Sequence, residues 1–201
     1  RFVLIILVSL TGFLVALRMM APTIWNTQLA AGVWTNFSVF LAMHFINAFL
    51  EFLFHRYVLH APLVPFLSYF YRQHTLHHAL TSVTGRRAVS SSMGRELRIK
   101  NTYSIEEVAQ REASFFPWYA LLVFGTIWIP ILSCGQWLLP SLPIFLGGFV
   151  ALAWSLSLYE ILHAIEHWPL AKWLPLLEHP RFGRWWKLCY SFHLRHHADI
   201  R

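Results

Sequence analysis

The chain has 201 residues, of which 57% are hydrophobic and 12% charged, and its net charge is +7. Its length corresponds to one domain, but so apolar a composition excludes an ordinary soluble protein and indicates a membrane protein. The positive charge favours contact with anionic lipid and acidic partners. It does not indicate nucleic acid, because no nucleic-acid-binding motif accompanies the basic residues.

Four apolar segments predict transmembrane helices, because a helix rises about 1.5 Å per residue and a bilayer core is about 30 Å thick. The stretch from Ala113 to Tyr159 has no charged residue and is too long for a single crossing. We expect it to cross twice and to turn near Gly135, Pro140 and Pro143, with polar Ser133 and Gln136 in the turn. The expected spans are 2–20, 29–54, 113–132 and 140–162.

The distribution of Lys and Arg predicts the orientation of these spans. If Arg1 and segments 55–112 and 163–201 are cytoplasmic, 15 of the 16 basic residues lie inside and only Arg18 lies outside. We therefore expect residues 1–201 to form one membrane-embedded, all-α domain, a four-span bundle with cytoplasmic and interfacial helices. Cys134 and Cys189 would lie on opposite sides of the membrane, so no disulfide is expected.

Histidine is the residue type that organises the rest of the sequence. The chain has 12 histidines, and ten of them fall into four short clusters. Two clusters share the pattern HxxHH, whose histidines lie at i, i+3 and i+4 and are expected to point from one helix face toward a common spot. Imidazole is the commonest metal ligand in proteins. The predicted ligands are His55, His60, His74, His77, His78, His163, His167, His193, His196 and His197.

The spacing of the first pair, His55 and His60, does not fit a regular helix. Residues at i and i+5 point roughly 140° apart, so the two rings can share a face only if the helix breaks. Pro62 would supply that break. We expect an interfacial helix over 64–80 to follow.

The polar segment 81–112 separates the second cluster from the third predicted span. Ser104 to Glu107 has the capping-box pattern, which predicts a short helix running from Ile105 into the third span. The segment is long for a connection, so we interpret it as a lid or docking surface, with a solvated linker as the alternative.

Two carboxylates lie one helical turn from predicted ligands. Glu51 precedes His55, and Glu160 shares a face with His163, so each could accept the second ring N–H of a ligand. Glu166 points elsewhere on a regular helix. His44 and Asn47 continue the polar stripe of Glu51 deeper into the second span, either toward the site or as helix-to-helix hydrogen bonds.

Ten clustered histidines exceed what one ion can bind, so two ions are expected. A structural zinc site needs only four ligands and usually includes Cys. Haem ligation would place paired histidines opposite one another in mid-membrane. A nitrogen-rich, dinuclear site in a membrane instead favours attack on an unactivated C–H bond of a lipid, with dioxygen and electrons supplied from the cytoplasm.

The order of the four clusters resembles the integral-membrane fatty acid hydroxylase and sterol desaturase superfamily. The pattern HxxxxH, HxxHH, HxxxH, HxxHH covers about residues 44–201, and Phe54 to His60 (FHRYVLH) is especially similar to the fatty acid hydroxylase branch. The resemblance implies a four-span bundle capped by cytoplasmic helices, with a di-iron centre in which zinc could substitute. It further implies O2-dependent lipid hydroxylation, with a small haem or iron–sulfur protein as the electron donor.

Two alternatives stay open at this stage. The chain could be a desaturase, ketolase, or carotenoid- or sterol-modifying member of the same superfamily, since the ligand pattern does not separate these reactions. From another class, a histidine-rich membrane metal carrier would also bind metal. A carrier, however, needs ligands near mid-membrane, where only His44 and Asn47 are expected.

Overall fold

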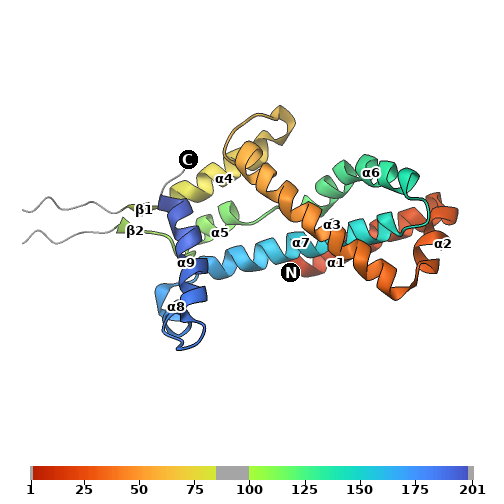
Figure 1. The fold of residues 1–201 in the computed structure, drawn as a ribbon. Helices are drawn as coiled ribbons and strands as arrows, with labels where there is room; N and C mark the ends of the chain where they lie inside the picture. Colours follow the sequence, from red (N-terminus) through yellow and green to blue (C-terminus); the bar gives the residue numbers. More distant parts are fainter. Residues whose placement is uncertain (1, 85–99, 199–201) are drawn as a thin grey trace, which may run out of the picture. The chain divides into compact units, whose positions relative to one another are not determined.

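The computed structural model describes residues 2–84 and 100–198 of the chain, and this part is almost entirely helical. It divides into two compact units, each made of two stretches of sequence (Figure 1). Unit 1 contains residues 1–54 and 116–161, and unit 2 contains residues 55–115 and 162–201. This division follows closely the predicted division into membrane spans and cytoplasmic segments.

Unit 1 is built from five helices, among them the long apolar ones. These helices are α1 (Phe2–Met20), α2 (Pro22–Ala30), α3 (Gly32–Phe54), α6 (Ala120–Leu138) and the larger part of α7 (Ile144–Glu166). Within the described residues, four helices are long and apolar enough to cross a membrane: α1, α3 with the turn that follows it, α6 and α7. The predicted number of long, apolar helices is therefore confirmed for these residues.

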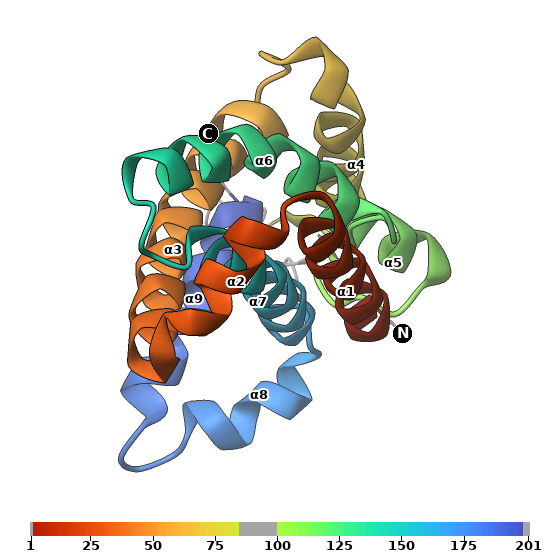
Figure 2. The ribbon, with the colours of Figure 1, turned by 90° about the vertical axis from the view of Figure 1, so that its right-hand side faces the viewer.

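Helix α7 lies at the centre of unit 1, with α1, α2, α3 and α6 around it (Figure 2). Of its most apolar window 61% is buried, against 11% in α1 and α3, whose apolar side chains remain exposed. Close packing of α7 depends on small residues, since a Cβ added at Gly148 would collide with the side chain of Leu132 on α6. A helix bundle with an apolar exterior is the arrangement expected in a lipid environment.

The predicted bounds of the third and fourth spans, 113–132 and 140–162, need correction. Helix α6 begins only at Ala120, because Pro117 disfavours helical geometry at the preceding residue and ends the helical path. It then runs through Ser133 and Gln136, which were expected in the turn, and the chain turns at 139–143. Gln136 nevertheless shapes that turn, since its Nε2 donates to the carbonyls of Leu142 at 3.0 Å and Pro140 at 3.1 Å.

A buried amide pair joins the ends of three helices in unit 1. Gln28 of α2 is fully buried, and its Nε2 donates to Oε1 of Gln136 on α6 at 2.9 Å. Its Oε1 accepts the backbone N–H of Leu146 at 3.2 Å, an amide in the first turn of α7 that has no partner within its own helix. The side chains of α2 and α6 thus fix the start of α7.

Unit 2 contains the shorter elements. They are the π-helical turn η1 (His55–Leu59), the 3-10 turn η2 (Pro65–Leu67), α4 (Ser68–Leu80), the strand pair β1 (Val83–Thr84) and β2 (Lys100–Asn101), α5 (Val108–Ser114), the end of α7, α8 (Leu170–Leu177) and α9 (Gly183–Ala198). The strands pair antiparallel, with Val83 opposite Asn101. The expected lid at 81–112 lies partly outside the described residues.

Helix α5 differs from the helix predicted to start at Ile105 and to run into the third span. It begins at Val108 and ends at Ser114, and its N-cap is Glu107, in a capping box with Gln110, rather than Ser104. Gln110 Oε1 accepts the backbone N–H groups of Glu106 and Glu107 at 2.8 and 2.9 Å. Its Nε2 donates to the carbonyls of Leu80 and Thr102, so one buried amide ties α5 to the end of α4.

The Gln28 contacts predict a measurable loss of stability. Replacing Gln28 with Leu keeps the side-chain volume but leaves the Leu146 N–H without its acceptor, which should cost about 1–3 kcal/mol. Thermal unfolding in detergent should therefore show a lowered transition temperature. Gln73→Leu, on the partly exposed face of α4, serves as the control and should leave that temperature nearly unchanged. Equal stability of the two variants would contradict this role of Gln28.

Candidate metal centre

The first two histidines converge through a π-helical turn. The backbone N–H of His60 donates to the carbonyl of His55 at 3.2 Å, the i to i+5 hydrogen bond that defines this geometry. Because each turn then holds one residue more than an α-helical turn, residues five apart face the same way. The Nε2 atoms of His55 and His60 lie 3.0 Å apart. The expected break is thus real, but it begins at His55 itself rather than at Pro62.

The three histidines of each HxxHH motif do not point toward one common spot, contrary to the prediction. On α4, His74 and His78 point toward one spot and His77 toward another. On α9, His193 and His197 share a spot and His196 points away from it. The physical reason is that neighbouring helix residues differ by about 100° in direction, so i+3 and i+4 cannot both meet i. Each motif therefore supplies ligands to two sites.

The ten predicted ligands thus gather in two groups within unit 2. Five of them form the His77 group: His77, His163, His167, His193 and His197. Four others form the His74 group: His55, His60, His74 and His196. The tenth, His78, lies against this second group, with its Nε2 at 3.0 Å from Nε2 of His74. In each group the ligand atoms lie within 4.8 Å of one another, so each could hold a metal ion.

The two groups are neighbours. The rings of His78 and His197 are stacked with their centroids 4.2 Å apart, and the rings of His74 and His77 are 5.9 Å apart. The alternating use of α4 and α9 produces this closeness, since each helix carries ligands of both groups. Unit 2 therefore places two possible metal positions side by side.

Inside each group the Nε2 atoms face one another at short distance. In the His77 group the pairs are His163 with His77 at 3.1 Å, His193 with His167 at 3.0 Å, and His197 with His193 at 3.2 Å. In the His74 group the corresponding contacts lie between 3.0 and 3.2 Å. For metal–nitrogen bonds of 2.0–2.1 Å, neighbouring ligand atoms are about 2.9 Å apart at right angles and about 3.4 Å apart in a tetrahedron. The observed separations lie within this interval.

The hydrogen bonds made by the outer Nδ1 atoms of the His77 group determine which ring nitrogen carries the proton. His77 Nδ1 lies 2.7 Å from Ser114 Oγ, and that hydroxyl already donates its proton to the carbonyl of Gln110. The imidazole is then the donor of the first bond, so Nδ1 carries the proton. The same argument holds for His197, whose Nδ1 faces Thr81 Oγ1 at 3.2 Å while Thr81 donates to the His77 carbonyl.

Two further rings have an oxygen acceptor on their outer side. His167 Nδ1 donates to the carbonyl oxygen of Tyr103 at 2.6 Å. His193 Nδ1 lies 3.2 Å from Oε2 of Glu166. A neutral ring with its proton on Nδ1 has a lone pair on Nε2. Four of the five rings are therefore held in the tautomer that a metal ligand needs.

Facing lone pairs require a cation. His193 and His167 both carry their proton outside, so no hydrogen is left to join the two Nε2 atoms that lie 3.0 Å apart. The same is true of His197 and His193 at 3.2 Å. Two lone pairs at this distance repel each other in a buried site, where burial of unpaired polar atoms is already costly. A positive ion between them turns the repulsion into coordination, and the His77 group therefore fits a metal ion.

Burial keeps these rings neutral. Burial lowers the pKa of His78 to about 3, with nearby His196 adding to the effect. It likewise lowers the pKa of His167 to about 4, although the hydrogen bond to Tyr103 acts in the opposite direction. The pKa values of His74 and His77 also fall, chiefly through burial and then through neighbouring imidazoles. Neutral rings are the form in which histidine binds metals.

One carboxylate lies beside a predicted ligand where none was expected. Glu166, expected to point elsewhere, is the residue beside His193. Glu160 instead accepts the backbone N–H of Phe116 at 2.7 Å, and Glu51 is exposed on α3. The roles of Glu51 and Glu160 at ligands stay predictions. The contacts of Ser114, Thr81 and the Tyr103 carbonyl with predicted ligands were not predicted. Only the contact of Thr81 could have been suspected from the sequence, because Thr81 lies one turn after His77.

The remaining polar residues of the sequence analysis have other partners. His44 Nδ1 lies 2.9 Å from Ser155 Oγ, and Asn47 Nδ2 donates to the same oxygen at 3.4 Å. The alternative of helix-to-helix hydrogen bonds is therefore the one that the structure shows. His179 lies outside both groups, and its Nδ1 accepts the backbone N–H groups of Arg181 and Phe182.

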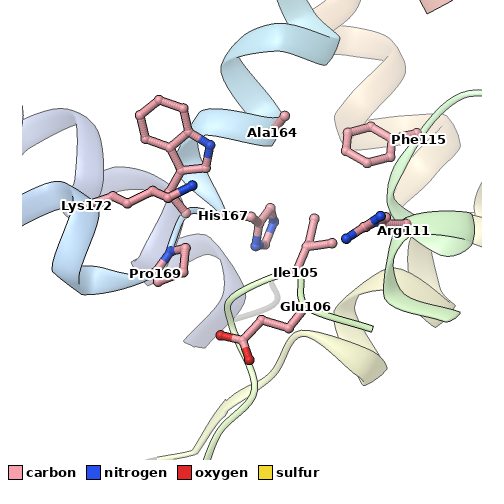
Figure 3. A pocket seen from close by; sticks show the side chains of 9 residues that line it. Ile105, Glu106, Arg111, Phe115, Ala164, His167, Pro169 and Lys172 are labelled. Atoms are coloured by element: carbon pink, nitrogen blue, oxygen red, sulfur yellow. The ribbon is translucent and has the colours of Figure 1, made fainter. Parts of the chain in front are cut away.

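A cavity of about 470 Å³ adjoins the His77 group. His167 lines it, and Figure 3 shows this ring between Lys172 on one side and Arg111 on the other. Lys172 Nζ also lies 5.3 Å from the centre of the Trp168 ring, which lines the cavity too. Glu106 is the acidic residue of the lining, so two cations face one anion. The cavity is suited to an anionic group and reaches a predicted metal ligand directly.

Comparison with protein-family models, with curated proteins and with solved structures finds no match.

The Ser114 contact predicts a loss of metal affinity without loss of a ligand. Ser114→Ala removes the acceptor that holds the proton on Nδ1 of His77, and loss of such an outer partner typically costs about 10–100-fold in affinity. Competition with a chelator on purified protein measures the effect. Ser191→Ala is the matched control, because that hydroxyl bonds groups of its own helix, the Leu188 carbonyl and the Arg195 guanidinium, and no histidine. Equal metal retention in both variants would refute the role of Ser114.

Proposed function

We propose that this protein is a membrane-bound, non-haem di-iron oxygenase that uses O2 and electrons to hydroxylate a lipid. The observation that carries the proposal is the pair of adjacent imidazole groups, in which Nε2 atoms converge at 3.0–3.2 Å and the outer Nδ1 protons of the His77 group are held by acceptors. Four apolar helices in the same chain supply the setting in which a lipid would reach such a site.

The ligand type is compatible with iron, and the proposed oxygen chemistry is the reason for choosing it. Imidazole nitrogen binds Zn, Cu, Fe and Ni, and neither group contains Cys. The His77 group would hold one ion, and the His74 group with His78 would hold the other. When bound, a pair of iron ions supplies the redox chemistry that lets dioxygen attack an unactivated C–H bond.

The protein orients the imidazole rings, keeps them neutral and excludes water from them. Ser114, Thr81 and the Tyr103 carbonyl hold the rings so that each inner nitrogen presents a lone pair. His77 and His167 are each 1% exposed, which keeps bulk water away from the inner nitrogens. Ligands that remain neutral leave the positive charge of the bound ions largely uncompensated, so the site attracts dioxygen-derived anions and electrons.

The lipid is proposed from the surface of unit 1. Helices α1 and α3 expose large apolar side chains over their length, and such a surface is stable in contact with acyl chains. His44 and Asn47 contact Ser155 within this unit rather than any metal ligand. We therefore assign to them a role in helix packing at the lipid-facing part of the molecule.

The cavity beside His167 supports an acidic electron donor. Arg111 and Lys172 provide positive charge at a place where a predicted ligand ring lines the wall. A small haem or iron–sulfur protein with acidic residues around its cofactor would be attracted to this charge. Electrons arriving there would be next to the His77 group.

The rival function, a metal carrier, has less support. A carrier exposes its ligands alternately to both sides of the membrane from positions near the middle of the bilayer. Here all ten predicted ligands belong to unit 2, and His44, the histidine of the second span, is bonded to Ser155. We keep the related reactions of desaturation, ketolation and carotenoid or sterol modification as outcomes of the lipid analysis.

Metal analysis tests the two-ion assignment. The parent protein should bind two equivalents of iron, or of zinc in its place, while His77→Ala and His74→Ala should each lose metal from their own group. His179→Asn is the control, because Asn retains an acceptor for the Arg181 and Phe182 amides and lies outside both groups. One equivalent or none in well-folded parent protein would sink the dinuclear proposal.

Mass spectrometry of lipids tests the reaction. Cells that express the parent protein should accumulate a lipid that has gained one oxygen, and cells that express His77→Ala should not. A product that has lost two hydrogens would identify a desaturase instead of a hydroxylase. Absence of any altered lipid, together with metal flux in proteoliposomes, would favour the carrier.

A further inference from the structure

Four aromatic rings form a continuous path in unit 2, from the His77 group to the surface. The ring of Tyr103 lies 4.5 Å from that of His167 and 6.3 Å from that of Tyr190, measured between centroids. Tyr190 lies 5.2 Å from Trp173, and Trp173 lies 6.1 Å from Trp186. We call these four residues the aromatic chain: Tyr103, Tyr190, Trp173 and Trp186.

The exposure of the rings changes along the aromatic chain. Tyr103 and Trp173 are each 1% exposed, whereas Trp186 at the far end is 37% exposed. Trp173 is fixed by a hydrogen bond from its Nε1 to the Ile165 carbonyl at 3.1 Å, and it packs α8 against α9. The path therefore starts at a predicted metal ligand, crosses the interior on oxidisable rings and ends in contact with the surroundings.

Tyr and Trp are the side chains that release one electron most readily among the aromatic residues. Phe or Leu would fill the same interior without this property, so packing alone does not call for four oxidisable rings in sequence. Electron transfer between rings in near contact is fast, and each step here joins neighbouring rings. Tyr103 is doubly placed, since its carbonyl also holds the proton of His167.

We propose that the aromatic chain carries electrons from Trp186 to the metal ligands when dioxygen has been activated without a lipid to oxidise. This inference rests on the proposed oxygenase function. It assigns to the chain a protective activity: an oxidising equivalent, generated from dioxygen and left at the site, is removed before it damages the histidines.

The electrons and protons balance as follows. Trp186 gives up one electron and becomes a radical cation, and the electron passes through Trp173, Tyr190 and Tyr103 to reduce the site by one equivalent. A surface reductant such as ascorbate then restores Trp186 and is itself oxidised by one electron. Tyr103 and Tyr190 each pass one electron toward the site and receive one from the next ring outward, so both end as neutral phenols and no net proton is lost. Partly exposed Tyr190 exchanges its proton with water.

The first experiment needs no metal. Cys189 is exposed and lies three residues from Trp186 on α9, so a ruthenium photo-oxidant can be attached there in a Cys134→Ser background, with persulfate as the electron acceptor. Illumination of metal-free protein should trap a tyrosyl radical whose electron paramagnetic resonance signal changes in Tyr103→Phe, where the radical can reach only the partly exposed Tyr190. The signal of Tyr103 should be lost in Tyr190→Phe, which interrupts the path, and retained in Trp185→Phe, which does not. A signal indifferent to Tyr103, or surviving in Tyr190→Phe, overturns the inference.

The second experiment uses the iron-loaded protein with O2 and ascorbate but no lipid. Mass spectrometry of peptides should find oxidation at Trp186 in the parent, and a shift of oxidation to the histidines in Trp186→Phe. The exposed position of Trp186 makes that variant a safer choice for folding than Trp173→Phe. Histidine oxidation that is equal in parent and Trp186→Phe overturns the protective role.

The two experiments separate the two proposals. If the photo-oxidant produces the Tyr103 radical but the iron-loaded protein consumes no O2, electron transfer along the aromatic chain is supported and the oxygenase function is refuted. If lipid hydroxylation is observed but no Tyr103-dependent radical forms, the oxygenase function is supported and electron transfer along the aromatic chain is refuted.

Discussion

Repulsion between inward-facing imidazole lone pairs is the constraint on which the rest of unit 2 depends. Nε2 of His193 approaches Nε2 of His167 at 3.0 Å and Nε2 of His197 at 3.2 Å, with all three ring protons held on the outside. Such an arrangement is unfavourable for the protein alone and favourable around a cation. The short helices, the π-helical turn and the strand pair can be understood as the structure that holds these rings in place.

Hydroxyl and backbone groups around the histidines hold the rings in place. Ser114 and Thr81 each accept an imidazole N–H and pass their own proton to a helix carbonyl, so each hydroxyl is fully used. Gln110 of α5 links the same region through four hydrogen bonds to backbone groups of α4 and of the segment between α4 and α5. Since both the rings and their partners are buried, a local change in one contact is transmitted to ring orientation. This is the physical basis for expecting metal affinity to respond to residues that touch no metal.

The clustering of ten histidines and the four apolar helices could be predicted because they follow from residue type and spacing. The division of the ligands could not be predicted in full: His74, His77 and His78 are adjacent in sequence, and only the approach of α9 decides which ring meets which. The π-helical turn at His55 was visible only as a spacing that no regular helix satisfies. The role of the Tyr103 carbonyl could not be predicted from the sequence, since every residue has a backbone carbonyl. Glu166 was misjudged because its partner lies on another helix.

X-ray absorption at the metal edge of the purified, loaded protein tests the central claim most directly, because it reports which atoms surround the ion. The account predicts a first shell dominated by nitrogen at about 2.0–2.1 Å for zinc, with the outer scattering pattern of imidazole rings. In the His77→Ala variant the remaining metal should keep that imidazole pattern at the His74 group. A first shell of oxygen or sulfur without imidazole scattering would contradict the claim that these histidines form a metal centre.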